Sequence, residues 1–268
     1  MLALPATPPT PLVTDAGRPG TLGTGQPGAL LFARFAFPPN ALGLCGPETG
    51  LTLPERVRDG RMDLELRRIA QGFEGAWPYL ELIAAENDLR DPLDARVVEA
   101  YWLGNDLLGH VGTRAHHADL ETRFRDRARP SDWRWLESKA DSDARVHHSF
   151  HVLEVLPRIG LIRGGLPAGM LGVLERCLIR PAVVTGRDGG HLEVAVPPLD
   201  LVDGKLRLGP PRQERLAFEP GDGYGDEPNA GDLVALHWER VCGRLTPLQA
   251  ARLRSVTERN LGVANMTI

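Results

Sequence analysis

PAVVTGRDGGHLEVAVPPLDLVDGKLRLG, residues 181–209, marks the point where the chain changes from helical to β-rich. Short runs of β-branched and apolar residues in it are separated by the pairs Asp188-Gly189 and Asp203-Gly204. An Asp-Gly pair between two such runs is a strong hairpin signal, because glycine adopts a positive φ without steric cost. Two later runs, ERLAF at 214–218 and GDLVALHW at 231–238, add further strands. We therefore expect a small β-sheet after residue 180.

Upstream of this stretch, apolar residues recur at three- and four-residue steps, as on the buried face of a helix. The pattern predicts two helices within 62–87 and another that follows Asp91, which can cap it. A short buried helix is expected over 29–36. Pro38 and Pro39 should end it, because proline lacks the N–H group that continues the helical hydrogen bonds.

Two further helices are predicted from their caps. Asp141 or Ser142 can begin a helix that runs to about Leu156 and is stopped by Pro157. Thr246 is the expected N-cap of a final helix with the sequence PLQAARLRSVTERNL.

Together these elements predict an α+β protein whose N-terminal two-thirds are predominantly helical, followed by a small C-terminal β-sheet and a final helix. Residues 1–27 are rich in proline and glycine and show no hydrophobic period, so a disordered tail is expected there. We divide the rest into a helical domain, 28–179, and a β-containing subdomain, 180–268, packed on the helical part.

Composition excludes several classes of partner. The 268 residues are 42% hydrophobic and carry a net charge of only -4, so neither nucleic acid nor a membrane surface is an expected partner. Three cysteines stand far apart, which argues against a disulfide framework and for a reducing compartment, the cytoplasm. We expect no membrane span and no secretion signal. The oligomeric state is left open.

No phosphate-binding GxxxxGK(S/T) loop, no GxGxxG after a strand, no GxSxG elbow and no paired CxxC occurs in the sequence. Nucleotide hydrolysis and dinucleotide redox chemistry therefore lack their usual motifs, and no nucleotide cofactor is expected.

The segment HHSFHVLEV at 147–155 carries the strongest signal for a metal site. In a helix, His147 and His151 stack on one face, and Glu154 lies three residues further along it. Two imidazoles and a carboxylate that converge in this way can ligate nickel, zinc or iron. If His148 points inward instead, the face changes and Glu154 drops out. Histidines at this spacing also occur as hydrogen-bonded core residues, and that alternative stays open.

Two residues outside the segment could complete such a site. Cys45 lies in Cys-Gly-Pro, within an expected loop, where a thiolate could be a soft ligand. His237 lies near a strand end, where binding sites often form. For both, a packing role is the alternative. Cys177 stands among Val173, Leu174 and Leu178, and we expect it to be a core residue.

Several strings of this sequence resemble an uncharacterised family of actinobacterial proteins, a domain of unknown function whose genes are associated with nickel–iron hydrogenase clusters. The strings are FARFAFPPNALGLCGP at 32–47, GFEGAWPYLELIA at 72–84, VVEAYWLGN at 97–105, HHSFHV at 147–152 and LHWERVCGRLT at 236–246. The resemblance covers about residues 28–265. It implies an accessory role in making, loading or assembling a metalloenzyme, with a hydrogenase subunit or maturation factor as partner.

Three functions follow as hypotheses. The first is an accessory or maturation protein that binds a metal, or a maturing subunit, through the histidine cluster. The second is a metal-dependent enzyme in which the same cluster activates water or oxygen. The third is a structural scaffold without a metal, in which the histidines are packing residues.

Overall fold

The computed structural model describes residue 22 and residues 25–139, 142–159, 169–218 and 227–266. Most of the predicted tail therefore lies outside the described residues. Leu22, inside that tail, is fully buried, and its N–H donates to the Arg244 carbonyl at 2.8 Å. Gln249 donates in turn to the Leu22 carbonyl at 2.7 Å, so this residue is held from both sides.

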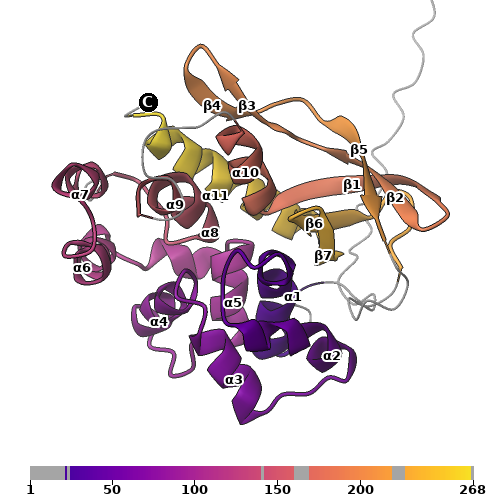
Figure 1. The fold of residues 1–268 in the computed structure, drawn as a ribbon, viewed down its shortest axis with the longest axis horizontal. Helices are drawn as coiled ribbons and strands as arrows, with labels where there is room; N and C mark the ends of the chain where they lie inside the picture. Colours follow the sequence, from indigo (N-terminus) through magenta and orange to yellow (C-terminus); the bar gives the residue numbers. More distant parts are fainter. Residues whose placement is uncertain (1–21, 23–24, 140–141, 160–168, 219–226, 267–268) are drawn as a thin grey trace, which may run out of the picture.

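Helices form the N-terminal part of the molecule, drawn from indigo through magenta to red in Figure 1. They bury a core of aromatic and aliphatic side chains that includes Phe32, Phe35, Tyr79 and Tyr101, each fully buried. In chain order these elements are α1 (Gly28–Ala41), η1 (Glu48–Thr52), α2 (Leu53–Arg58), α3 (Leu64–Gln71), α4 (Trp77–Ala85), α5 (Ala95–Trp102), η2 (Asp106–Gly109), α6 (Thr113–Phe124), α7 (Pro130–Glu137), α8 (His148–Phe150), the π-helical turn η3 (His151–Val155), α9 (Leu156–Ile159) and α10 (Met170–Cys177).

An antiparallel sheet follows, with the strand order β5-β2-β1-β6-β7. Its strands are β1 (Arg180–Asp188), β2 (His191–Val196), β5 (Arg212–Ala217), β6 (Leu233–His237) and β7 (Arg240–Arg244). β3 (Leu199–Val202) and β4 (Lys205–Leu208) form a separate hairpin whose turn is Asp203-Gly204. Both turn residues have positive φ, 51° and 73°, as the Asp-Gly signal predicts.

The final helix, α11 (Pro247–Ala264), joins the two parts of the fold. It contacts α8 and η3 on the helical side and β1, β4 and β6 on the other, and Figure 1 shows it between them. Thr246 caps it with a complete capping box, accepting from Gln249 N at 3.1 Å. The predicted α+β class, with helices first, a small sheet and a final helix, is confirmed. Among the described residues, no helix is both long and apolar enough to cross a membrane.

The first helix differs from the expectation. α1 continues through Pro38 and Pro39 to Ala41 instead of ending before them. Pro39 cannot donate to the Phe35 carbonyl four residues earlier, so that acceptor is left free. His237 donates to it from Nδ1 at 2.7 Å. A side chain from β6 thus replaces the missing backbone hydrogen bond, and the helix can include its prolines.

The histidine segment also differs. The expected helix from residue 141 or 142 does not form over its first turns, since His147 is extended (φ -137°, ψ 156°) and α8 begins only at His148. Asn260 of α11 causes this difference. Its side chain bonds the backbone of Arg145 on both sides, accepting from N at 2.9 Å and donating to O at 3.2 Å. The backbone groups that a helix would have used are therefore occupied by a distant residue.

Candidate metal centre

His237 offers a free lone pair to the interior. A backbone carbonyl can only accept, so the contact with Phe35 places the hydrogen of the neutral ring on Nδ1. Nε2 then carries the lone pair. It is buried and makes no hydrogen bond with any residue that the structure describes. A buried unpaired acceptor is costly, and a cation is one way to satisfy it.

Each ring nitrogen of His148 faces an acceptor, but the neutral ring has only one hydrogen to donate. Its Nε2 lies 2.9 Å from the Cys177 carbonyl, and its Nδ1 lies 3.3 Å from the Tyr101 hydroxyl. The Tyr101 hydroxyl donates its only hydrogen to the Gly75 carbonyl, at 2.9 Å. A neutral imidazole has one N–H, so it can satisfy the Cys177 carbonyl or the tyrosine oxygen, but not both. With the hydrogen on Nδ1, the chain His148 to Tyr101 to Gly75 is complete, and a metal on Nε2 would take the place that the Cys177 carbonyl now occupies beside that nitrogen.

Cys177 supplies sulfur at the same point. It is the last residue of α10, and the backbone turns extended at Leu178 before β1 begins. Burial, together with the nearby Cys45, raises the pKa of its thiol to about 12, while the Trp238 indole N–H opposes the rise. The thiol is therefore protonated unless a cation replaces the proton.

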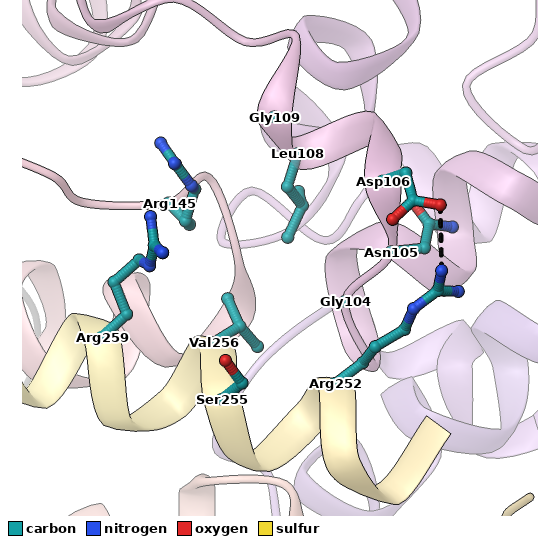
Figure 2. A pocket seen from close by; sticks show the side chains of 10 residues that line it. All are labelled: Gly104, Asn105, Asp106, Leu108, Gly109, Arg145, Arg252, Ser255, Val256 and Arg259. Atoms are coloured by element: carbon teal, nitrogen blue, oxygen red, sulfur yellow. Dashed lines mark hydrogen bonds and ion pairs between the residues drawn. The ribbon is translucent and has the colours of Figure 1, made fainter. Parts of the chain in front are cut away.

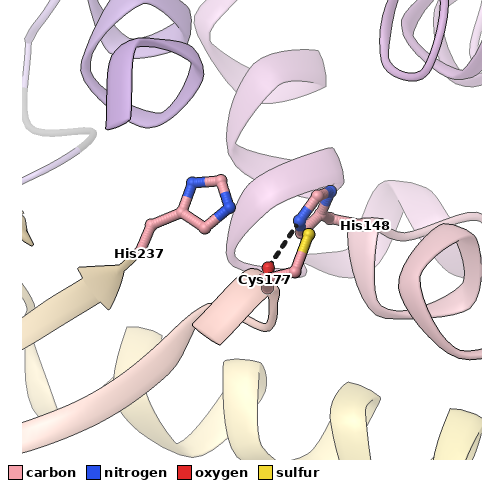
Figure 3. Close-up of side chains that lie close together, drawn as sticks. All are labelled: His148, Cys177 and His237. Carbon is pink, nitrogen blue, oxygen red and sulfur yellow. Dashed lines mark hydrogen bonds between the residues drawn. The ribbon is translucent and has the colours of Figure 1, made fainter. Parts of the chain in front are cut away.

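One ligand atom from each of His148, Cys177 and His237 lies within 4.8 Å of the other two (Figure 3). Around a bound tetrahedral ion such atoms are about 3.3–3.8 Å apart, so the three side chains must close in slightly. Both histidines are buried. A cavity of about 80 Å³ adjoins the trio and is also lined by Cys45 and His151.

Burial keeps the histidines in the form that a metal needs. It lowers the pKa of His148 to about 4 and that of His151 to about 3. The pKa of His237 lies well below its ordinary value, because burial and the neighbouring His148 disfavour the cation more than the carbonyls of Phe35 and Cys177 favour it. These imidazoles are neutral at pH 7, and neutral imidazole is the ligand form.

A strained turn places an indole beside the thiol. Trp238 and Glu239 form the turn between β6 and β7, and both have positive φ, 49° and 61°. Residues other than glycine lose roughly 1–2 kcal/mol each in this region. The backbone N–H of Trp238 donates to the Arg176 carbonyl at 2.8 Å, which fixes the turn against the residue before Cys177. The Trp238 side chain lines the cavity, so the strain occurs at the candidate centre.

Two of the six predicted ligand residues, His148 and His237, belong to this trio. His147 instead caps α8, with Nδ1 accepting from Ser149 N at 3.0 Å. His151 lines the cavity, and its Nδ1 lies 3.5 Å from the Tyr79 hydroxyl.

The other two predicted residues lie in different surroundings. Glu154 forms a buried ion pair with Lys139 at 3.3 Å and accepts from Trp135 Nε1 at 2.8 Å, so its carboxylate faces other partners. Cys45 lines the cavity and is exposed, which places it where the cavity meets solvent. The one-face arrangement of His147, His151 and Glu154 depended on a regular helix, and the extended His147 and the π-helical turn remove that regularity.

Cys177 was not among the predicted ligands. Its apolar neighbours in the sequence indicate core packing, and the residue is indeed at the end of an amphipathic helix. The one local signal was the position of Cys177 at the boundary between a helix and a strand. That signal is weak by itself, because the two histidines of the trio lie far from Cys177 in the sequence, in α8 and β6.

The chain belongs to a family of unknown function, DUF6390, whose model matches residues 24–268. Comparison with curated proteins and with solved structures gives no match.

Proposed function

We propose that this protein binds a transition metal through His148, Cys177 and His237, with Cys45 as the candidate fourth ligand. The observation that carries the proposal is the hydrogen-bond shortfall described above. Nε2 of His237 is buried without a hydrogen-bond partner among the described residues, and the two nitrogens of His148 face two acceptors with only one hydrogen to donate. The Cys177 thiol lies beside both rings. A cation at that point would supply what all three groups lack.

The ligand chemistry suits zinc, nickel or iron. Imidazole and thiolate together favour these borderline or soft ions over magnesium or calcium, which prefer oxygen. Cys45 would make a two-cysteine, two-histidine set of the kind that holds structural zinc. Without Cys45, the fourth position would face the cavity and stay open.

As its role we propose an accessory protein for a nickel–iron hydrogenase-type metalloenzyme, which holds the metal or a maturing subunit. Two features support this role. The sequence resembles a family associated with such gene clusters, and Leu42, Leu44 and Leu51, on either side of Cys45, expose large apolar side chains. Exposed leucines beside a metal cavity suit a partner that docks at its mouth.

Metal analysis of protein purified without a histidine tag tests the binding step. We expect close to one equivalent of zinc, nickel or iron in the wild type, and a loss of about 100-fold or more in affinity in His148→Ala, His237→Ala and Cys177→Ser. His147→Asn is the matched control, because asparagine keeps the helix cap and removes an imidazole. Absence of metal after reconstitution with each ion, or equal loss in the control, would overturn the proposal in favour of a structural scaffold.

The accessory role has its own test. Deletion of the gene in its host should lower hydrogenase activity, and wild type but not the His148→Ala, His237→Ala double variant should restore it. Unchanged hydrogenase activity after deletion would remove this role and leave the metal site standing.

A metal-dependent enzyme is the second candidate. The observation that favours it is the cavity of about 80 Å³ beside the trio, which has room for a few water molecules or one small substrate. Cobalt-substituted protein distinguishes the two functions. A visible spectrum that shifts when azide is added indicates an open coordination position, whereas an unchanged tetrahedral spectrum that depends on Cys45 indicates a closed site.

A further inference from the structure

A second cavity, of about 340 Å³, lies between α11 and η2 (Figure 2) and shares no lining residue with the metal trio. Arg252, Ser255, Val256 and Arg259 line it from one face of that helix, at spacings that align side chains along a helix. The opposite wall is η2 and the residues before it, and Arg145 reaches in from the segment that precedes α8. Three guanidinium groups from two distant parts of the chain therefore surround one space.

The positive charge at this cavity exceeds the negative charge that balances it. Arg145 and Arg259 share one carboxylate, Asp143, at 3.2 and 2.8 Å. Arg252 pairs with Asp106 at 2.9 Å, at the other end of the cavity in Figure 2. Among the residues that the structure describes, three cations and two carboxylates meet at this cavity, which leaves one net positive charge at the end where Arg145 and Arg259 lie.

Both balancing carboxylates are easy to displace. The side chains of Asp143 and Asp106 are 63% and 88% exposed. Exposed ion pairs contribute little, because water screens them and both side chains must be held in place. An anion that carries two charges and several oxygens can replace such a partner, since guanidinium groups bind phosphate in a bidentate manner.

The remaining lining indicates what the anion is attached to. Ser255 offers a hydroxyl beside the arginines, while Leu108 and Val256 form an apolar wall. The rim is open at Gly109, where an added Cβ would meet nothing within 4 Å. The volume falls within the range of small-molecule sites, about 300–1,000 Å³.

We propose that this cavity is a binding site for a small organic phosphate, whose phosphate group is held by Arg145 and Arg259 and whose carbon skeleton lies against Leu108 and Val256. The site is separate from the metal trio, so it does not depend on the metal proposal.

Calorimetric titration with phenyl phosphate, inorganic phosphate and phenol tests the proposal. Phenyl phosphate should bind more tightly than inorganic phosphate, phenol should not bind, and added salt should weaken both anions. The double variant Arg145→Gln, Arg259→Gln should lose about tenfold or more in affinity for phenyl phosphate. Arg254→Gln is the matched control, because Arg254 is on the same helix but pairs with Glu258 outside the cavity lining.

Asp143→Asn gives a test of opposite sign. It removes the carboxylate that competes for two of the arginines, so phenyl phosphate should bind up to about fivefold more tightly. Arginines that serve only to stabilise the fold would give no such gain. Equal affinity in the wild type and the double variant, or no gain in Asp143→Asn, would overturn the proposal. Preferential binding of a DNA duplex over phenyl phosphate would also overturn it, in favour of a nucleic-acid surface. Metal content should be unchanged in all these variants.

Discussion

His237 Nδ1 donates to the Phe35 carbonyl at 2.7 Å, across 202 positions of sequence. The acceptor is free because residue 39, four positions later, is a proline. This contact sets the tautomer of the ring and turns its Nε2 lone pair toward His148 and Cys177. A proline in the first helix therefore helps to orient a candidate metal ligand on the last hairpin.

Pro39→Ala should weaken metal binding. The new backbone N–H would compete for the Phe35 carbonyl, and His237 would lose the partner that fixes its tautomer. We expect a loss of about tenfold or more in metal affinity, the size found when outer partners of ligand histidines are removed. Pro38→Ala is the control, because its N–H would reach the Arg34 carbonyl instead. Nitrogen-15 shifts of the His237 ring check the mechanism, and unaltered shifts together with unaltered affinity would contradict it.

Tyr101→Phe should lower both stability and metal affinity. The Gly75 carbonyl would lose its donor and His148 Nδ1 would lose its contact. Leaving a buried carbonyl without a partner costs about 1–3 kcal/mol in the free energy of unfolding, which denaturant titration measures. Tyr79→Phe should affect metal affinity less, because its hydroxyl lies near His151 and not His148. A Tyr101→Phe protein with full metal affinity would show that the hydroxyl does not position the ring.

Glu154→Gln should destabilise the fold without changing metal affinity. The side chains of Glu154 and Lys139 are 0% and 1% exposed, so the substitution removes a negative charge that lies 3.3 Å from a buried ammonium group. Breaking such a pair costs about 3–5 kcal/mol. Glu258→Gln, in an exposed pair with Arg254, should change stability by less than about 1 kcal/mol. A Glu154→Gln protein that is as stable as the wild type but no longer binds metal would contradict this prediction and indicate that Glu154 is a metal ligand.

Acid should unfold the metal-free protein. Burial is the main cause that lowers the pKa of four histidines to about 3 or 4: His116, His147, His148 and His151. In the unfolded chain these rings titrate near about 6.5, so below that pH the unfolded state binds more protons and gains stability. Stability should be full above pH 6.5 and fall as the pH drops toward 4.

The size of this effect can be checked. At pH 5 each ring should destabilise the fold by about 2 kcal/mol, and four rings together approach the whole stability of a typical domain, about 5–15 kcal/mol. Urea titrations between pH 4 and 8 measure the slope. His116 lies away from the metal trio and packs on Phe150. The His116→Leu variant should therefore take up about one proton fewer on unfolding, and its stability should depend less steeply on pH. A stability that is flat from pH 7 to pH 4.5 would contradict the neutral, buried state of these rings.

Local signals predicted the elements that local interactions hold. Asp203-Gly204 forms the expected turn, because glycine adopts a positive φ freely and aspartate tolerates it better than most residues. Thr246 caps α11 through partners within three residues. Near Asp91 the same logic misplaced the cap. Asp94 is the N-cap of α5 and accepts from Arg96 N at 2.9 Å, while Asp91 accepts from Leu93 and pairs with Arg67.

The candidate site was predictable only in part. The histidine-rich segment and His237 stand out in the sequence, and one histidine of the segment and His237 meet in the structure. Cys177 was missed because its neighbours are apolar, and a buried ligand has the same sequence context as a core residue. His147 left the expected helix because Asn260, 115 positions beyond Arg145, occupies the backbone that the helix needed.

The sequence by itself determined most of the helices, the strands and their order, because hydrophobic period, turn residues and caps act within a few positions. Tertiary structure alone decided which imidazoles meet a thiol and which nitrogen of each ring is free. Those outcomes depend on contacts between residues far apart in the chain, such as His237 with Phe35 and His148 with Tyr101, and no local pattern encodes their direction.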